Sequence, residues 1–120
     1  TASVGYPPDP ASKVKKALEF EGVKYIHILS PCPTGWGFPP SETVEIGKLA
    51  VDAYFWPLYE IERGELRITV KPKKIPISEY VRRQRRFRHL TDRDLADLQR
   101  IVDEQWEILK KLEGIGKIFP

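Results

Sequence analysis

The chain has 120 residues, of which 41% are hydrophobic and 31% are charged, a composition typical of one globular domain or part of one. No apolar run approaches the roughly 18 residues that a membrane-spanning helix needs, so we expect no membrane partner. The formal net charge of +3 is too small to indicate nucleic-acid binding.

The chain contains one cysteine, Cys32, and no methionine. A single cysteine excludes an intramolecular disulfide and favours a reducing, cytoplasmic location. One thiolate cannot hold zinc or an iron–sulfur cluster alone, so any such site would need ligands from elsewhere. Because translation begins with methionine and the first residue is Thr1, we expect the chain to be a fragment of a longer protein.

The first third of the chain has the pattern of the last half of a βαβ unit. Residues 1–6 read as the end of a strand and its turn, and a helix follows from Asp9 to about Glu21. Residues 24–29 are nearly continuously apolar, which is typical of a buried parallel strand, with His27 as a core histidine. The apolar face of the helix would comprise Val14, Ala17 and Leu18. The predicted fold class is therefore α/β.

The next segment, residues 30–40, contains four prolines and two glycines and is predicted to be a loop. It follows the carboxyl end of the predicted strand, which is the edge where open α/β sheets bind ligands. A helix from Ser41 to about Ala53 comes next. Its buried face would comprise Ile46, Leu49, Ala50 and Ala53.

The rest of the chain predicts a β-hairpin and two helices. The hairpin joins residues 56–62 to residues 65–70 through a short turn, and an extended connector leads to a helix from Ser78 to about Arg88. The last helix begins at Thr91, which forms a capping box with Asp94. Its apolar stripe and its end are Leu95, Leu98, Val102, Trp106, Leu109, Leu112 and Gly114.

Cys32 lies between two prolines, which fix the backbone on both sides and hold the thiol in a rigid loop. A rigid thiol at this edge of a sheet suits a ligand of an iron–sulfur cluster. The alternative is a buried structural cysteine that acts as a small hydrophobic side chain. Trp36 and Phe38 either shield a cofactor or pin the loop to the core, and we favour the second interpretation.

Five arginines occur within residues 82–88 and are followed by His89. Such a segment could bind phosphate, nucleic acid or an acidic protein surface. The last helix is rich in aspartate and glutamate, so ion pairs within the chain or between subunits are the simpler explanation, and nucleic acid is an unlikely partner. No glycine-rich phosphate loop, catalytic triad or carboxylate pair is present.

Residues 25–38 (YIHILSPCPTGWGF) resemble the strand and loop of the β subunit of pyruvate synthase and related 2-oxoacid:ferredoxin oxidoreductases. Residues 1–7, 41–66 and 79–91 are similar to other parts of the same subunit, in the same order. The resemblance implies that residues 1–40 are the end of the thiamine-diphosphate-binding domain with its cluster loop. Residues 41–120 would then be a carboxy-terminal extension.

Members of this family oxidise a 2-oxoacid with coenzyme A to acyl-CoA and carbon dioxide, using thiamine diphosphate and magnesium, and pass electrons to ferredoxin. The resemblance implies that Cys32 is one of four cysteine ligands of a 4Fe-4S cluster. It also places Thr34, Gly35 and Trp36 near that cluster. Pyruvate is the expected substrate, with a branched-chain 2-oxoacid as the alternative. The other ligands and the diphosphate motif are absent here, so we expect this chain alone to bind no cofactor and to be inactive.

Overall fold

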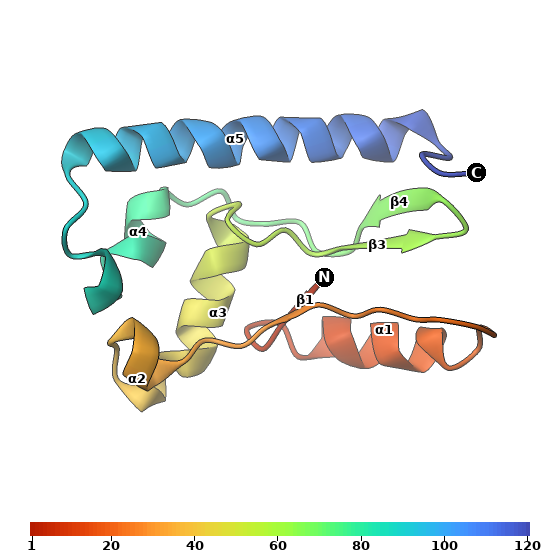
Figure 1. The fold of residues 1–120 in the computed structure, drawn as a ribbon, viewed down its shortest axis with the longest axis horizontal. Coiled ribbons are helices and arrows are strands. Elements are labelled where there is room, and N and C mark those ends of the chain that lie inside the picture. Colours follow the sequence, from red (N-terminus) through yellow and green to blue (C-terminus); the bar gives the residue numbers. More distant parts are fainter.

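The structure, a computed structural model, describes all residues from 1 to 120. Figure 1 shows an elongated molecule in which the long helix α5 runs along one side and α1, with the extended stretch that follows it, runs along the other. The hairpin lies between these two layers, and α3 and α4 pack at one end. The elements are β1 (Ala2–Ser3), α1 (Pro8–Ala17), β2 (Ile28–Leu29), α2 (Pro33–Trp36), η1 (Pro40–Glu42), α3 (Thr43–Asp52), β3 (Tyr59–Glu62), β4 (Glu65–Ile68), α4 (Ile77–Val81), η2 (Arg85–Phe87) and α5 (Asp92–Ile115).

The predicted α/β class and the parallel pairing are confirmed. β1 and β2 are parallel neighbours, with Ala2 opposite Ile28 and Ser3 opposite Leu29, and α1 is the crossover between them. The strand predicted over residues 24–29 is reduced to Ile28 and Leu29. Strand residues need backbone hydrogen-bond partners, and β1 provides only two residues for this pairing. Residues 23–27 form no strand, although their backbone runs on as an extended stretch in Figure 1.

Three details of this unit differ from the prediction. The helix ends at Ala17, not near Glu21, because the chain turns back through short-range backbone bonds before Gly22, which has a φ of 90°. Val14 and Leu18 are exposed, so the face that packs inward is a different one. His27 is exposed as well, so the prediction of a core histidine was wrong; its ring contacts the edge of a tryptophan indole.

The main core lies where α3, α4 and α5 meet. The predicted apolar face of α3 is buried as expected, and it packs against Tyr80 of α4 and Trp106 of α5. Tyr54 stacks on Trp106 with ring centroids 4.8 Å apart. Burial of large aromatic side chains at this junction holds the three helices together. None of the helices combines the length and the apolar character that a membrane span requires.

The hairpin is confirmed, with Tyr59 opposite Ile68 and Glu62 opposite Glu65 in the antiparallel β3–β4 pair. Two predicted helix starts were wrong. α3 begins at Thr43, because the prolines before it form the turn η1 first, and α4 begins at Ile77, directly after an extended proline.

The predicted helix from Ser78 to Arg88 is interrupted. α4 ends at Val81, Gln84 is extended, and the short helix η2 follows. Gln84 is buried and its side-chain Nε2 donates to the carbonyl of Tyr80, which satisfies the end of α4 and redirects the chain. The capping box of α5 is confirmed, but this helix continues through Gly114 and ends at Ile115, before Gly116 with a φ of 84°.

Candidate functional site

Cys32 is the N-cap residue of α2. Its backbone is extended, with φ −104° and ψ 106°, and the next residue is the proline that opens the helix. The amide of Gly35 donates to the sulfur over 3.4 Å, and the amide of Trp36 donates to the Cys32 carbonyl over 2.9 Å. The thiol therefore stands at a fixed helix start with one backbone donor directed at it.

The thiol is free and exposed. The alternative of a buried structural cysteine was therefore wrong. Proline on both sides keeps the backbone rigid, while Pro31 is buried and anchors the preceding strand end. An exposed sulfur on an anchored loop is accessible to a metal or to an electrophile.

Two glycines shape the loop around this sulfur. A Cβ at Gly35 would lie 3.4 Å from the Cys32 Sγ, in van der Waals contact with it, so a side chain there would cover part of the thiol. Gly37 has a φ of 75°, and a Cβ there would lie 2.6 Å from the Cβ of Arg85. The carbonyl of Gly37 accepts from the Arg85 amide over 3.1 Å, so the loop and η2 touch through their backbones.

Arginine from η2 stacks on the loop. The guanidinium of Arg86 lies 3.7 Å from the ring centroid of Trp36 and 4.4 Å from that of Phe87. The Nε of Arg86 also donates to Gln84 over 2.9 Å. Phe38 is buried in the main core, so the interpretation that these aromatic residues pin the loop fits the structure.

A groove of about 570 Å³ lies between α2 and η2. It is strongly basic, and its lining residues are Thr34, Gly35, Trp36, Gly37, Arg85, Arg86, Arg88 and His89. The structure thus brings the three residues predicted to surround the cluster to one wall of a basic groove. Of these three, Gly35 is the one that contacts the thiol through its amide.

The five arginines are only partly neutralised within the chain. Arg82 pairs with Asp92 of α5 over 3.1 Å, and Arg83 pairs with Glu42 over 3.0 Å. Arg85 and Arg88 have no acidic partner within 4 Å. Internal pairing therefore accounts for two of the arginines and leaves the groove positively charged.

The chain has no complete metal site of its own. No three His, Cys, Asp or Glu side chains lie close enough together to hold a metal ion. Cys32 can supply one ligand, and the Gly35 amide supplies the kind of hydrogen bond that sets the potential of a cluster sulfur. The remaining ligands would have to come from another part of the protein.

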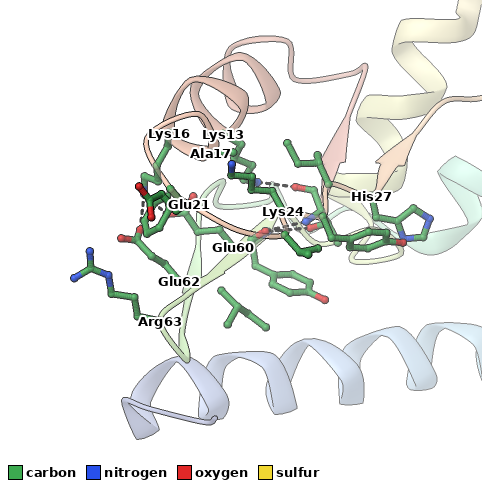
Figure 2. Close-up of a pocket in the computed structure, with 16 residues that line it drawn as sticks. Lys13, Lys16, Ala17, Glu21, Lys24, His27, Glu60, Glu62 and Arg63 are labelled. Atoms are coloured by element: carbon green, nitrogen blue, oxygen red, sulfur yellow. Dashed lines mark hydrogen bonds and ion pairs between the residues drawn. The ribbon is translucent and has the colours of Figure 1, made fainter. Parts of the chain in front are cut away.

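A second pocket, of about 540 Å³, separates α1 and residues 20–27 from the hairpin (Figure 2). Lys16 reaches into it and bonds Glu60 over 2.6 Å and Glu62 over 3.3 Å. Burial alone would raise the pKa of Glu60, but hydrogen bonds from Lys16 and Arg67 hold that pKa below its ordinary value. The charges at this end of the pocket are thus mutually compensated.

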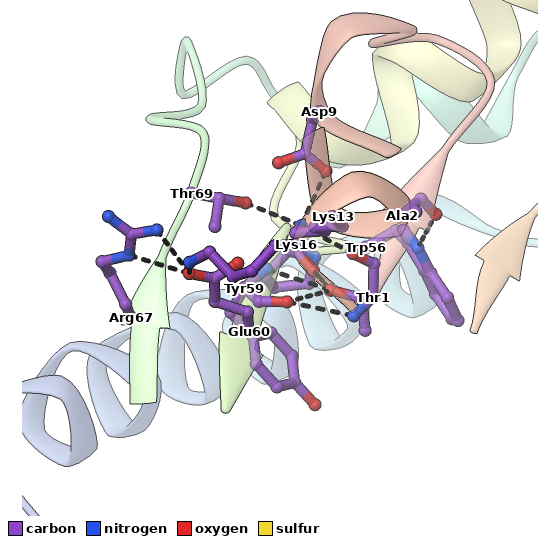
Figure 3. Close-up of polar contacts among 11 residues, drawn as sticks. Thr1, Ala2, Asp9, Lys13, Lys16, Trp56, Tyr59, Glu60, Arg67 and Thr69 are labelled. Atoms are coloured by element: carbon purple, nitrogen blue, oxygen red, sulfur yellow. Dashed lines mark hydrogen bonds and ion pairs between the residues drawn. The ribbon is translucent and has the colours of Figure 1, made fainter. Parts of the chain in front are cut away.

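A buried lysine connects the two layers at the inner end of this pocket (Figure 3). The Lys13 ammonium donates to Asp9 over 2.6 Å, to the Thr1 carbonyl over 2.7 Å and to the Thr69 hydroxyl over 2.7 Å. The sequence contained no signal for this contact, since a lysine on a charged helix reads as exposed.

A buried aspartate makes a second link that sequence reasoning missed. Asp52, at the end of α3, accepts from the Tyr6 hydroxyl over 2.6 Å and from the Lys73 amide over 3.1 Å. Burial and then the hydrogen bond to Asp52 raise the pKa of Tyr6 above its ordinary value. The contact fixes the turn after β1 against α3, which in turn fixes the sheet edge that leads to Cys32.

Comparison with known proteins reveals close relatives. The chain is 54% identical over 110 residues to "Pyruvate synthase subunit PorB" of Methanocaldococcus jannaschii, a match that spans 91% of this chain and 37% of the relative. It is 44% identical to the subunit of the same name from Thermotoga maritima, across 100% of this chain and 39% of the relative. It is 46% identical to "Ketoisovalerate oxidoreductase subunit VorB" of Pyrococcus abyssi, across 96% of this chain and 38% of the relative. No family model matches.

These relatives are named as subunits of pyruvate synthase and of ketoisovalerate oxidoreductase, and the chain spans less than two fifths of their length. The matched part includes nearly every residue of this chain, among them the whole stretch whose resemblance was noted from the sequence. The chain is therefore a relative of the PorB and VorB subunits over almost its entire length.

Proposed function

We propose that the chain is the carboxy-terminal part of the thiamine-diphosphate subunit of a 2-oxoacid:ferredoxin oxidoreductase, with pyruvate as the substrate and a branched-chain 2-oxoacid as the alternative. In this role, Cys32 is one ligand of a 4Fe-4S cluster. The observation that carries the proposal is the exposed Cys32 thiol at the N-cap of α2, with an amide donor directed at its sulfur. Relatives named for pyruvate and relatives named for ketoisovalerate both match the chain, so the choice of substrate has less support than the role as a subunit of this enzyme class.

When bound, the cluster would pass single electrons from the thiamine-linked oxidation to ferredoxin. This chain would contribute the Cys32 ligand, the Gly35 amide that stabilises negative charge on sulfur, and a loop that reorganises little. It contains no diphosphate-binding motif and one cysteine, so thiamine diphosphate, magnesium and the remaining ligands would belong to other parts of the protein. We therefore propose that the chain alone is inactive.

The test is a Cys32→Ser variant of the complete subunit in its assembled complex. We expect a lower iron content per subunit and a loss of ferredoxin reduction, because serine is a poor ligand for this kind of cluster. Ser30→Ala in the same loop is the matched control and should retain both properties, since the Ser30 side chain makes no hydrogen bond. Full iron content and full ferredoxin reduction in Cys32→Ser would show that the ligand assignment is wrong.

A second role, docking of another subunit, is favoured by the basic groove between α2 and η2. Arg85 and Arg88 carry charge into this groove without an acidic partner from the chain. Charged groups of this kind commonly set orientation and partner choice at interfaces. Reversal of both charges to glutamate should weaken assembly with the other subunits, and Lys111→Glu on α5 is the control. Salt-dependent nucleic-acid binding that is lost in the same variant would instead support a nucleic-acid role.

A further inference from the structure

The pocket between α1 and the hairpin is bordered by two open strand edges. On one side lies β3, and on the other lies the extended stretch of residues 23–27 (Figure 2). Both edges border the same gap, and Thr1 lines its inner end. Open edges of this kind present unpaired backbone donors and acceptors to any strand that can fit between them.

The orientation of the β3 backbone follows from its pairing with β4. Thr69 donates to the carbonyl of Leu58 over 2.9 Å, so the backbone groups of Leu58 face β4. In an antiparallel pair this orientation alternates along the strand, so the backbone groups of Tyr59 and Ile61 face away from β4. Tyr59 agrees with this alternation, because its carbonyl accepts from the backbone nitrogen of Thr1 and its amide donates to the Thr1 hydroxyl, each over 3.0 Å. Ile61 is the next residue whose backbone faces the gap.

The opposite edge has the same property. The carbonyls of His27 and Leu29 accept from the amides of Ala2 and Val4, over 2.8 Å and 3.3 Å. Odd-numbered residues of this stretch therefore direct their backbone groups towards β1, and Tyr25 continues the series into the gap. Two large hydrophobic side chains of this stretch are exposed: 101% of Val23 and 82% of Tyr25 is accessible.

Thr1 is the point where these two edges converge. It bonds to Tyr59 on one side, and the next residue bonds to His27 on the other, so β1 already lies between the two edges (Figure 3). In Figure 1 the amino terminus lies between the hairpin and the extended stretch that follows α1. Extension of the β1–β2 register backwards by about four residues would reach Val23.

We propose that this pocket is a strand-binding groove, occupied in the complete subunit by the residues that directly precede Thr1. These residues extend β1, pair in parallel with residues 23–27 and pair antiparallel with β3. The two separate ladders then become one four-stranded sheet in the order β2–β1–β3–β4. The inference rests on the placement of the chain at the carboxyl end of a longer subunit, as proposed above.

A strand fits this groove better than a small ligand does. Of the cations that line the pocket, Lys16 is already paired with Glu60 and Glu62, and Arg63 lies over the ring of Phe20 at 5.7 Å. Lys24 also lines the pocket and forms no ion pair, but the two facing backbone edges carry donors and acceptors that another strand satisfies and a small ligand does not. The continuous sheet would connect the cluster loop at residues 30–40 rigidly to the carboxy-terminal extension.

Hydrogen exchange in the complete, assembled subunit tests the pairing. We expect the amides of Tyr25 and Ile61 to be protected to a similar degree as the Thr69 amide, which is already bonded to Leu58. The exposed connector residue Lys74 gives the rate of an unprotected amide. If Tyr25 and Ile61 exchange as fast as Lys74, the pairing is absent and the proposal is overturned.

A cross-linking experiment identifies the occupant. Cysteine at Ile61 and cysteine two positions before Thr1 should be joined by a short thiol-reactive linker, because paired residues lie about 5 Å apart. Cysteine at Glu60, whose side chain points to the other face, is the matched control and should link poorly. Protection of Ile61 without this cross-link would mean that another segment fills the groove, and the proposal would fail while the Cys32 assignment stood. A gene in which the initiator methionine directly precedes Thr1 would overturn the placement as well.

Discussion

Lys13 holds three oxygen atoms from different segments at a position from which water is largely excluded. Its side chain and that of Asp9 are each 8% exposed. Its other two partners belong to the first residue and to the segment after β4, so one ammonium connects the α1 layer to the hairpin. A charge in such a position is stabilised only while its partners remain in place.

Lys13→Met should therefore lower the free energy of unfolding by about 3–5 kcal/mol, because it leaves the Asp9 carboxylate buried without its counter-ion. Urea-induced unfolding measures the change. The double variant Asp9→Asn, Lys13→Met removes both charges and should recover a large part of the loss. A double variant that is less stable than Lys13→Met would contradict this explanation.

Gly37 is required by both its backbone conformation and its surroundings. Its φ is 75°, and a Cβ would meet the Cβ of Arg85 at 2.6 Å. Gly37→Ala should destabilise the protein by about 1–3 kcal/mol and should disturb the contact between the cluster loop and η2. Gly114→Ala is the matched control: it lies inside α5 with no atom within 4 Å, and should stabilise the helix by about 0.5 kcal/mol. Equal effects of the two substitutions would contradict the explanation.

Among the elements, α5 has the best-defined start. The Thr91 amide and hydroxyl both donate to the Asp94 carboxylate, each over 2.7 Å, and these bonds lower the pKa of Asp94. A carboxyl group whose pKa is lower in the folded state stabilises that state above its unfolded pKa of roughly 4. That contribution is lost as the pH falls through the lower, folded pKa.

Asp94→Asn should therefore lower stability near neutral pH and flatten the acid side of the stability curve. Thermal unfolding between pH 7 and pH 2 would measure both effects. Asp97→Asn on the same helix is the control, because the Asp97 side chain makes no hydrogen bond to the cap. Identical acid dependence in Asp94→Asn and in the unaltered protein would exclude a role for the capping box.

Elements with a local signal were predictable from the sequence. The hairpin follows from the Arg63-Gly64 turn between alternating side chains, and the α5 cap follows from the spacing of Thr91 and Asp94. The break after α4 was not predictable, because it depends on a buried glutamine that bonds back to Tyr80. The length of β2 was not predictable either, since a strand is defined by its neighbour and not by its own composition.

The same distinction applies to the candidate site. The rigidity of the loop around Cys32 follows from its flanking prolines, so that part was accessible from the sequence. The stacking of Arg86 on Trp36 joins residues 50 positions apart, and no local pattern specifies it. The residues next to Cys32 thus predicted a rigid loop with a functional thiol, whereas the basic groove between α2 and η2 depends on tertiary packing.

At the scale of the whole molecule, the two long sides differ in how they are covered. One side of α5 packs on the main core through Leu95, Val102 and Trp106. The opposite layer leaves apolar side chains of α1 and of the following stretch in contact with solvent. Unpartnered apolar surface of this kind is a common site of association.

We therefore predict that this chain of 120 residues, studied alone, self-associates through the α1 layer. The exposed side chains include Leu18 at 78% and Val23 at 101%, and burial of such surface is worth about 25 cal/mol per Å². Analytical ultracentrifugation at two concentrations should show a rising average mass, and Leu18→Lys should reduce it. Ile108→Lys is the control, because Ile108 is also exposed but lies on α5 at the other side. A monomer at both concentrations, or an equal effect of the two lysine variants, would show that the α1 layer does not drive association.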